Sequence, residues 1–422
     1  MDLVPQVRTR GPDQVEQLLP SVSEQRWGAR LAVIAVAAAV AVSVIYLPQS
    51  LLSSLATDLG VPVGRAGLAA TAVQAGYALG IVALVPLADR VHPRQQVTRQ
   101  SLLLAGALAL SAVLPGVASL ALGFAVVGLV ANIAQVLIPA ASRLAPPGRA
   151  GATTATLVGS LSVGIFGGRI LASLLVDLIG WRLVVVVFAA IVLATVPFVR
   201  RALDTELEMA ADRVAYPRLL ADTVALVRRS PELWQSGLMQ FFVFATFNSI
   251  WTVMVLHLTS EPYGWSVRAA GLFGLVGIAA ALSAPLAGRL LDRHGSLPVA
   301  GVALVLILLA TATVILDSRH LVVFGLSMFV ATAASQGHQS AQQNRILAAN
   351  PGRAAQANTM FMFFVFLGGS VGAFVGPAAY GAGGMPRVAG LGCVFLVLAL
   401  AVWVPTALRG RRLAAGAPAA TL

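Results

Sequence analysis

Lysine is absent from this sequence, cysteine occurs once, and charged residues of either sign are scarce. Charged side chains make up 10% of the 422 residues, against about 25% in soluble globular domains. So few charges cannot cover the surface of a soluble enzyme or binding module, which excludes both classes. The one cysteine, Cys393, lies in an apolar stretch, so a disulfide framework and a cysteine-based metal site are excluded as well.

The basic residues are therefore all arginine, 28 of them against 16 acidic residues. Without lysine the phosphate-binding loop Gly-x-x-x-x-Gly-Lys-Ser/Thr cannot exist, which excludes an ATP-driven pump of that kind. The net charge of +12 would suit a nucleic-acid partner. However, the arginines lie in short tails and loops between apolar runs, with no basic face that carries aromatics, so we expect no nucleic-acid binding. The bias toward arginine, alanine, valine and glycine indicates a GC-rich bacterial genome.

Clusters of catalytic or metal-binding side chains are also missing. The five histidines are scattered at positions 92, 257, 294, 320 and 338, and no aspartate or glutamate lies deep in an apolar run. A polytopic membrane enzyme would need such groups gathered near one membrane face. The sequence therefore predicts no enzyme activity, no metal site and no cofactor.

Long apolar runs are what the sequence has in abundance, since 58% of its residues are hydrophobic. A membrane-spanning helix needs about 20 apolar residues to cross ~30 Å of hydrocarbon. Twelve runs have about this length, and their ranges are 29–51, 67–88, 101–117, 119–141, 152–176, 181–199, 235–257, 267–290, 298–316, 320–342, 357–379 and 388–407. The sequence therefore predicts an all-α membrane protein with twelve transmembrane helices.

Two short patterns repeat at almost the same spacing. The stretch from Val85 to Arg90, Val-Pro-Leu-Ala-Asp-Arg, returns as Gly-Arg-Leu-Leu-Asp-Arg from Gly288 to Arg293, and the two aspartates are 203 residues apart. The tetrad Pro-Gly-Arg-Ala occurs at 147–150 and again at 351–354, an offset of 204 residues. Two unrelated patterns that repeat in this way indicate a tandem duplication.

The Gly-x-Leu-x-Asp-Arg-x-Gly pattern at 288–295 resembles the loop signature of the major facilitator superfamily, membrane transporters built from two six-helix halves. The helix 4–5 region and the run 339–358 are similar to bacterial efflux-type members of that family. The resemblance implies two pseudo-symmetric six-helix bundles. The expected ranges are a tail at 1–26, bundles at 27–200 and 233–408, a loop between them at 201–232, and a tail at 409–422.

The placement of arginine predicts the orientation in the membrane. With both termini in the cytoplasm, twenty-two arginines fall in inside loops and tails and five fall outside. This bias follows the positive-inside rule, so we expect a multi-pass protein of the bacterial cytoplasmic (inner) membrane with both termini cytoplasmic. In the 201–232 loop, Leu219, Leu220, Val224 and Val227 share one side of a helical wheel. This pattern predicts either a short helix on the inner membrane surface or a solvated linker.

In the superfamily, the signature loop is held to clamp the cytoplasmic gate in one alternating-access state. An acid at the end of a helix is disfavoured by the helix dipole unless a cation pairs with it. The resemblance implies a gating role for Asp89, Arg90 and Arg94 in the first half, and for Asp292 and Arg293 in the second. The first copy departs from the family pattern at Val85, His92 and Pro93, so a positive-inside loop with one incidental acid is the alternative there.

In the family, helices 1, 4, 7 and 10 face a central cavity, and polar side chains inside a span normally point away from lipid. Polar and aromatic residues recur on these helices and on helix 2, which predicts that they line a substrate cavity. The candidates are Tyr46, Gln49, Gln74, Tyr77, Asn132, Gln135, Gln240, Phe244, Asn248, Trp251, Gln336 and Gln339. For any single amide, a structural hydrogen bond between helices is the alternative.

Arg169 is the only charge placed well inside a predicted span, in the outer half of helix 5. Inserting an arginine at a helix centre costs about 2.5–3.5 kcal/mol, so we add Arg169 to the cavity candidates. Its guanidinium would reach helix carbonyls, a substrate carboxylate or Asp177. A structural role as a snorkelling anchor in the outer leaflet is the alternative.

No deep carboxylate is available to pair with an organic cation, so neutral amphipathic or anionic small molecules are favoured as substrates. Protons are the expected coupling ion, and His338 is the one titratable group well inside a span, with an ordinary pKa of about 6.5. Asp58 and Asp177, at outer helix ends, are the next candidates. A His338 whose nitrogens are satisfied by neighbouring amides is the alternative.

These features predict a secondary transporter that works as a monomer in the lipid bilayer. We expect it to export a small organic molecule, a drug or a metabolite, by proton antiport between two rocking halves. Uptake by proton symport is the alternative, because no residue encodes direction. A membrane sensor is a further alternative, but it usually carries a soluble output domain, and the sequence predicts none.

Overall fold

A computed structural model describes residues 22–204 and 215–416, and every regular element in these ranges is a helix. The first half contains α2 (Val22–Ser43), η1 (Val44–Tyr46), α3 (Leu47–Ser50), α4 (Leu52–Asp58), α5 (Val63–Leu84), η2 (Val85–Asp89), α6 (Pro93–Ser111), α7 (Val117–Val130), α8 (Ile133–Leu144) and α9 (Ala150–Ala202). After α10 (Tyr216–Arg229), the second half contains α11 (Pro231–Thr259), α12 (Val267–Leu272), α13 (Gly274–Ala281), α14 (Ala284–His294), α15 (Ser296–Leu316), α16 (Leu321–Ala349), η3 (Pro351–Arg353) and α17 (Ala354–Gly416). Most of the predicted N-terminal tail, the end of the C-terminal tail and residues 205–214 of the predicted loop lie outside the described ranges.

Nine stretches of the described residues are long and apolar enough to cross a membrane. Two of them, Ala150–Ala202 and Pro351–Arg409, turn back at glycines, so each makes two crossings. α6 makes a further crossing although its first turns are polar, because Gln96 and Gln100 there are buried against neighbouring helices. The predicted twelve transmembrane helices in two six-helix bundles are therefore confirmed.

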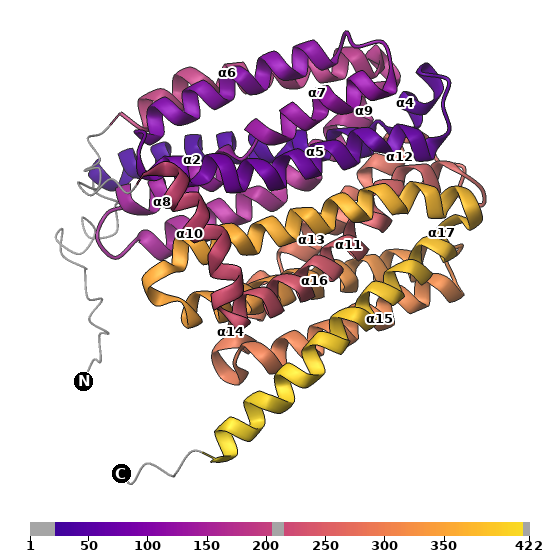
Figure 1. The fold of residues 1–422 in the computed structure, drawn as a ribbon. Helices are drawn as coiled ribbons and strands as arrows, with labels where there is room; N and C mark the ends of the chain where they lie inside the picture. The colour runs from indigo at the N-terminus through magenta and orange to yellow at the C-terminus, as the bar shows by residue number, and fades with distance from the viewer. Residues whose placement is uncertain (1–21, 205–214, 417–422) are drawn as a thin grey trace, which may run out of the picture.

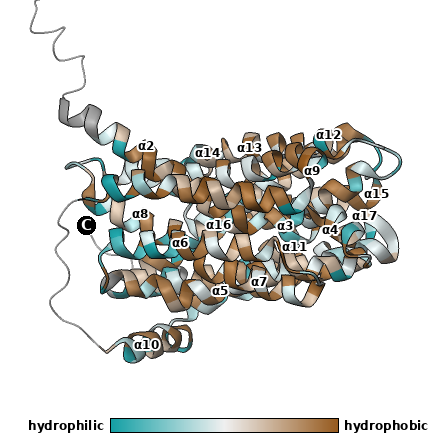
Figure 2. Ribbon diagram, turned by 90° about the horizontal axis from the view of Figure 1, so that it is seen from above, coloured by the Kyte–Doolittle hydropathy of each residue, from teal (hydrophilic) through white to brown (hydrophobic). Residues whose placement is uncertain are grey.

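The two bundles lie one above the other in Figure 1, with the first half at the top. The start of α2 and the end of α17 lie at the same end of the molecule, which we call the terminal face, and the opposite end is the distal face. Hydrophobic residues cover the lengths of the helices, and hydrophilic residues gather toward the ends and on α10 (Figure 2). A protein whose sides face lipid and whose ends face water needs this distribution.

Glycines with positive φ repeat between the halves. Gly60 has φ 61° and Gly264 has φ 60°, while Gly180 has φ 74° and Gly384 has φ 66°. The members of each pair are 204 residues apart, which is the offset of the Pro-Gly-Arg-Ala repeat. Only glycine adopts this left-handed backbone without steric cost. The duplication predicted from the sequence is therefore present in the backbone, and one offset relates the two halves.

Within each bundle, glycines let helices meet backbone to backbone. A Cβ added to Gly128 of α7 would lie 2.0 Å from the carbonyl oxygen of Val73 on α5. A Cβ added to Gly372 of α17 would lie 2.2 Å from the carbonyl oxygen of Ala245 on α11. Neither position has room for a side chain. These contacts therefore set the spacing between helices that carry many of the candidate residues.

The bundles meet along two seams, one between α5 and α17 and the other between α9 and the pair α12–α13. Near the distal face, Gly67 of α5 lies against Pro377 of α17, and Gly271 of α12 lies against Ser173 of α9. At the offset of 204 residues Gly67 corresponds to Gly271, and Pro377 corresponds to Ser173. The pseudo-twofold symmetry therefore repeats the same contact in both seams. Both seams are therefore closed at their distal ends.

Toward the terminal face the two seams differ. In the α5–α17 seam, the rings of Tyr77 and Phe366 pack with their centroids 4.2 Å apart. Their counterparts in the other seam are Ala281 and Ser162, which are too small to make the same contact. Accordingly, no residue of α14 is buried, and a Cβ at Gly288 would meet no atom within 4 Å. The molecule is thus closed at the distal face, and α9 and α14 are separated toward the terminal face.

The connecting stretch forms a helix, α10, that packs on the closed seam. Tyr216 donates its hydroxyl hydrogen to the carbonyl oxygen of Ala83, and the guanidinium carbon of Arg90 lies 5.7 Å from the centroid of the Tyr216 ring. Burial raises the pKa of the Tyr216 phenol, and the charge of Arg90 opposes this shift. Leu226 is buried in the same apolar cluster as Phe361 of α17. α10 therefore contacts both bundles and is not a solvated linker.

Candidate functional site

The first transmembrane helix breaks near its distal end. α2 stops at Ser43, a 3-10 turn follows, and α3 begins with Pro48 in its first turn. Proline lacks an N–H group and favours the first turn of a helix, so the helix restarts here. The break places Tyr46 and Gln49, both almost fully buried, against α9.

Three polar side chains form a connection between the bundles at this break. Nη2 of Arg169 on α9 donates to Oε1 of Gln49 at 2.6 Å, and Nε2 of Gln49 donates to Oδ1 of Asn248 on α11 at 2.9 Å. The amide nitrogen of Asn248 donates in turn to the carbonyl oxygen of Phe244 at 3.3 Å. Arg169 is 5% exposed and the other two are less exposed still. A buried polar connection therefore joins the first bundle to the second.

Three aromatic rings surround the guanidinium of Arg169. Its carbon lies 4.4 Å from the ring centroid of Tyr46, 5.2 Å from that of Trp251 and 5.5 Å from that of Phe166. We call Arg169 and these three rings the arginine box. At the offset of 204 residues Arg169 corresponds to Ala373, so the second half has no equivalent of the box.

His338 belongs to a second polar cluster, between α11 and α16. Its Nδ1 lies 2.7 Å from Oε1 of Gln240, and its Nε2 lies 3.2 Å from Nε2 of Gln342. Because an amide oxygen only accepts and an amide nitrogen only donates, His338 is neutral here, with its proton on Nδ1. Protonation of Nε2 would require the Gln342 amide to turn over. The geometry is that of a histidine satisfied by neighbouring amides.

The predicted cavity residues lie in several places. Those in or bonded to the arginine box are Tyr46, Gln49, Arg169, Asn248 and Trp251. A second group, on or beside the α5–α17 seam, consists of Gln74, Tyr77 and Phe244. The rings of Tyr77 and Phe244 pack against Phe366, and Gln74 and Phe244 lie next to Gly369. Gln240 and Gln339 belong to the His338 cluster, where their amides lie 3.5 Å apart. The half-buried Gln336 donates to the Ser162 hydroxyl of α9 at 3.4 Å.

Two of the candidates lie on the fourth transmembrane helix, away from the box. Asn132 accepts a hydrogen bond from Gln100 of α6 at 2.9 Å and donates to the carbonyl oxygen of Leu129 at 2.7 Å. Its side chain is fully buried and its amide is used in joining the third and fourth helices. Gln135 on α8 is only half-buried. The geometry gives Asn132 the packing role that was the alternative for each amide.

The gating candidates of the first half contact groups that the sequence did not single out. Nη1 of Arg94 lies 2.6 Å from Oδ1 of Asp204, which follows α9, and Arg90 lies over Tyr216. Arg94 and Asp204 are 36% and 62% exposed, and exposed pairs of this kind contribute ~0–1 kcal/mol. η2 ends at Asp89, whose side chain lies outside the described part of the structure.

The gating candidates of the second half are Asp292 and Arg293, at the end of α14. Both are exposed, and neither forms a salt bridge with any residue that the structure describes. Their helix is the one that is separated from α9. In this conformation the second-half loop is therefore not latched to the described residues.

The two acidic candidates for proton coupling lie at the distal face. Oδ2 of Asp58 accepts from Nε1 of Trp181 at 2.9 Å and pairs with Nη2 of Arg182 at 3.1 Å. Asp177 is exposed and makes no hydrogen bond to Arg169. Arg169 therefore has no carboxylate partner within the described ranges.

The position predicted for Arg345 was wrong. The sequence places it in an inside loop, whereas the structure extends α16 to Ala349 and puts Arg345 inside the helix. Its guanidinium donates to Oε1 of Gln235 at 2.7 Å and to Oγ of Ser236 at 2.9 Å, both on α11. Hydropathy ended the helix too early because this arginine is shielded by protein and does not need water.

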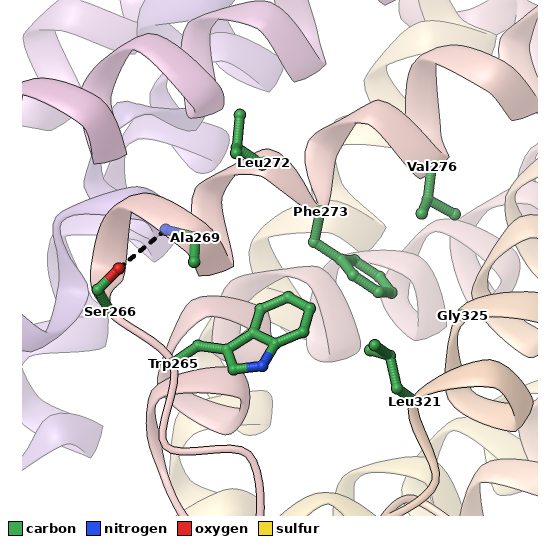
Figure 3. Close-up of a pocket in the computed structure, with 8 residues that line it drawn as sticks. All are labelled: Trp265, Ser266, Ala269, Leu272, Phe273, Val276, Leu321 and Gly325. Carbon is green, nitrogen blue, oxygen red and sulfur yellow. Dashed lines mark hydrogen bonds between the residues drawn. The ribbon is translucent and has the colours of Figure 1, made fainter.

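An apolar groove of about 620 Å³ lies between α12–α13 and the start of α16. The side chains of Trp265, Phe273 and Leu321 border it in Figure 3. In the first half, Gly128 brings α7 into contact with the backbone of α5, whereas the counterpart of Gly128 in the second half is the bulkier Thr332. The one polar side chain of the groove, Ser266, accepts the Ala269 N–H as a helix cap. The groove therefore lacks the polar groups that the arginine box offers.

The family model of the Major Facilitator Superfamily matches residues 31–373 and 236–421 of the chain. The chain belongs to the major facilitator superfamily. As a member of the major facilitator superfamily it is a membrane transporter and not an enzyme, as the sequence predicted. The twelve crossings, the duplicated halves and the two inter-bundle seams described above are the architecture of this family.

Relatives and solved structures of other facilitators agree with this assignment. Probable transporter SCO4007 of Streptomyces coelicolor is 32% identical over 386 residues, which cover 90% of this chain and 88% of the relative. Chloramphenicol efflux pump Rv0191 of Mycobacterium tuberculosis is 29% identical over 279 residues, 64% of each chain. A bacterial homolog to the human lysosomal transporter Spinster, solved in an inward-facing and unoccupied conformation, superposes with a TM-score of 0.72 at 15% identity, covering 89% of this facilitator and 96% of that chain.

Proposed function

We propose that this facilitator exports a small organic molecule across the bacterial inner membrane by alternating access, driven by the return flow of protons. The observation that carries the proposal is the buried polar connection from Arg169 through Gln49 to Asn248. Polar and charged groups inside a membrane are costly and mark solute pathways. Small-molecule sites combine aromatic walls with a few placed polar groups, and the arginine box has this composition.

The shape of the molecule supports alternating access. The distal ends of both seams are closed, while α9 and α14 are separated toward the terminal face. Most of the arginines fall in the loops and helix ends that the sequence assigns to the inner side, so the positive-inside rule favours a cytoplasmic position for the terminal face. The protein would then receive its substrate from the cytoplasm as a monomer. The similarity to a chloramphenicol efflux pump favours export.

Inverted membrane vesicles test this function. Vesicles with an acidified interior should accumulate a substrate, with chloramphenicol as the first probe in a panel of neutral and anionic compounds. Dissipating the proton gradient with a protonophore should stop the accumulation, and vesicles without the protein are the control. Accumulation only in right-side-out vesicles would identify the alternative, uptake by proton symport. Substrate transport that does not depend on the proton gradient would contradict proton coupling.

Replacement of Asp89 tests the proposed gate. We propose that Asp89 pairs with basic groups of the inside loops, so Asp89→Asn should reduce transport roughly tenfold or more while membrane insertion stays intact. Asp204→Asn is the matched control, and it should change transport by less than about twofold because its ion pair is exposed. Near-normal transport by Asp89→Asn at normal expression would show that the latch is dispensable.

Replacement of His338 tests the proton pathway. Proton uptake at Nε2 of His338 requires the Gln342 amide to turn over, and if this step couples transport, His338→Gln should flatten the pH dependence of gradient-driven transport. His257→Gln is the matched control, since His257 is also a buried histidine but bonds the carbonyl oxygen of Ser318 near the distal face. An unchanged pH profile in His338→Gln removes this residue from coupling and leaves Asp58 and Asp177 as candidates.

A further inference from the structure

Arg169 carries a buried charge that the described residues do not neutralise. Its side chain is 5% exposed, and only Nη2 has a hydrogen-bond partner, the Gln49 oxygen. Nε and Nη1 are buried without any partner among the described residues. Of the two acidic candidates at the distal face, Asp177 is exposed and Asp58 is paired with Arg182. A buried cation with unmade hydrogen bonds is costly, and proteins normally supply an anion to it.

The rings of the arginine box do not remove this need. Cation–π contacts attract the positive charge to the ring face but accept no hydrogen bond from the in-plane N–H groups. The N–H groups of a guanidinium point outward in its plane, where a planar oxyanion makes two parallel hydrogen bonds. The three rings lie 4.4–5.5 Å from the guanidinium carbon and accept no hydrogen bond from Nε and Nη1, whose donors remain unused.

The surroundings hold the guanidinium in one orientation. Gln49 is fixed at both ends of its amide, by Arg169 on one side and by Asn248 on the other. Tyr46, Phe166 and Trp251 give the site apolar walls, and Trp251 and Asn248 come from the second bundle. An inorganic anion would leave those walls unused, whereas an organic acid would occupy both the donors and the walls.

We propose that Arg169 binds the carboxylate of the transported molecule, and that the rings of the arginine box hold its aromatic or apolar body. This inference rests on the proposed transport function and narrows the substrate to organic acids. In the present conformation the free donors are covered. They become accessible when Trp251 and Asn248 move with the second bundle, so the acid binds as the bundles part. Since Ala373 occupies the equivalent position in the second half, each protein binds one carboxylate at such a site.

Binding to the purified full-length protein in chloride-free buffer tests the proposal. The probes are benzoate, 2-naphthoate and octanoate, each compared with its uncharged amide, and the readouts are thermal stabilisation and tryptophan fluorescence. At least one carboxylate should bind saturably while its amide binds roughly tenfold more weakly or not at all. Arg169→Lys should weaken that binding roughly tenfold, because lysine keeps the charge but lacks the planar fork. Arg169→Gln should abolish it.

Two glutamate variants test the missing counter-ion without any ligand. Gln49→Glu places a carboxylate on the atom that Arg169 already contacts, so it should raise the melting temperature and abolish carboxylate binding. Gln100→Glu is the matched control, because Gln100 is equally buried but bonds Asn132, away from Arg169. It should lower the melting temperature and, in the folded fraction, leave the affinity for the carboxylate unchanged.

The results separate this inference from the proposed function. Equal binding of acids and amides, carboxylate binding that survives Arg169→Gln, or carboxylate binding that survives Gln49→Glu would each overturn the inference. Equal protection by nitrate would also overturn it, since an inorganic anion would then suffice. Gradient-driven export of another compound in vesicles would leave the function standing in all these cases. Carboxylate binding without any gradient-driven transport would instead keep the site and refute the function.

Discussion

Gly372→Val is expected to prevent the protein from accumulating in a folded form. The Cβ of any residue at 372 would lie 2.2 Å from the carbonyl oxygen of Ala245 on α11. Overpacking a core usually costs about 1–3 kcal/mol when side chains can shift. Here the obstacle is backbone, so α11 and α17 must move apart along their shared length. Size-exclusion chromatography of the detergent-solubilised protein should show aggregate or no peak.

Gly390→Val is the matched control for this substitution. Gly390 lies in the twelfth crossing, after the turn at Gly383 and Gly384, and a Cβ there would meet no atom within 4 Å. Valine at 390 should therefore give a monodisperse peak and a melting temperature close to that of the original protein. A monodisperse Gly372→Val protein with unchanged stability would show that α11 and α17 are farther apart than the structure places them.

Cross-linking the distal end of the α5–α17 seam is expected to stop transport. In a Cys393→Ser background, cysteines at 64 and 378 would lie close to each other, because a Cβ at Gly64 lies 3.8 Å from the Cα of Ala378. A disulfide needs Cβ atoms about 3.5–4.5 Å apart, so an oxidant or a short bifunctional thiol reagent should link the two positions. The bond would hold the distal face closed, and alternating access requires that face to open. Transport in vesicles should fall roughly tenfold or more and recover with dithiothreitol.

Each single-cysteine variant serves as the control for the cross-link, and both should transport normally with or without oxidant. Electrophoresis after digestion between the two positions reports how much of the protein is cross-linked. Normal transport by fully cross-linked protein would mean that this seam stays closed throughout the cycle and that only the α9–α12 seam opens distally.

Much of the architecture could be predicted from the sequence because lipid imposes a simple rule on each helix separately. A run of about 20 apolar residues crosses the membrane, and this rule found eleven of the twelve crossings close to their observed positions. The third was shifted: the sequence predicts 101–117, whereas α6 spans Pro93–Ser111. Its polar first turns are shielded by protein, and hydropathy cannot distinguish shielding by protein from exposure to water. Arg345 was placed in a loop for the same reason.

The candidate site could be predicted only in part. A charge or amide inside a span signals a protected environment, and this signal found Arg169, Gln49 and Asn248. It did not show that they bond to one another, because partners such as Gln49 and Asn248 are 199 residues apart. The same signal selected Asn132, whose amide joins two helices instead. Phe166 was not predicted, because the sequence of an apolar run does not show which side chains an aromatic residue in it contacts.

The unequal seams give the terminal face one closed edge and one open edge. Tyr77 and Phe366 hold one edge of the interface together at a level where the other edge has only Ala281 and Ser162. α10 adds contacts to both bundles along the same closed edge. On the opposite edge, no residue of α14 is buried and Gly288 has open space around it. A solute that enters from the terminal face therefore passes between α9 and α14, and α5, α17 and α10 block the other side.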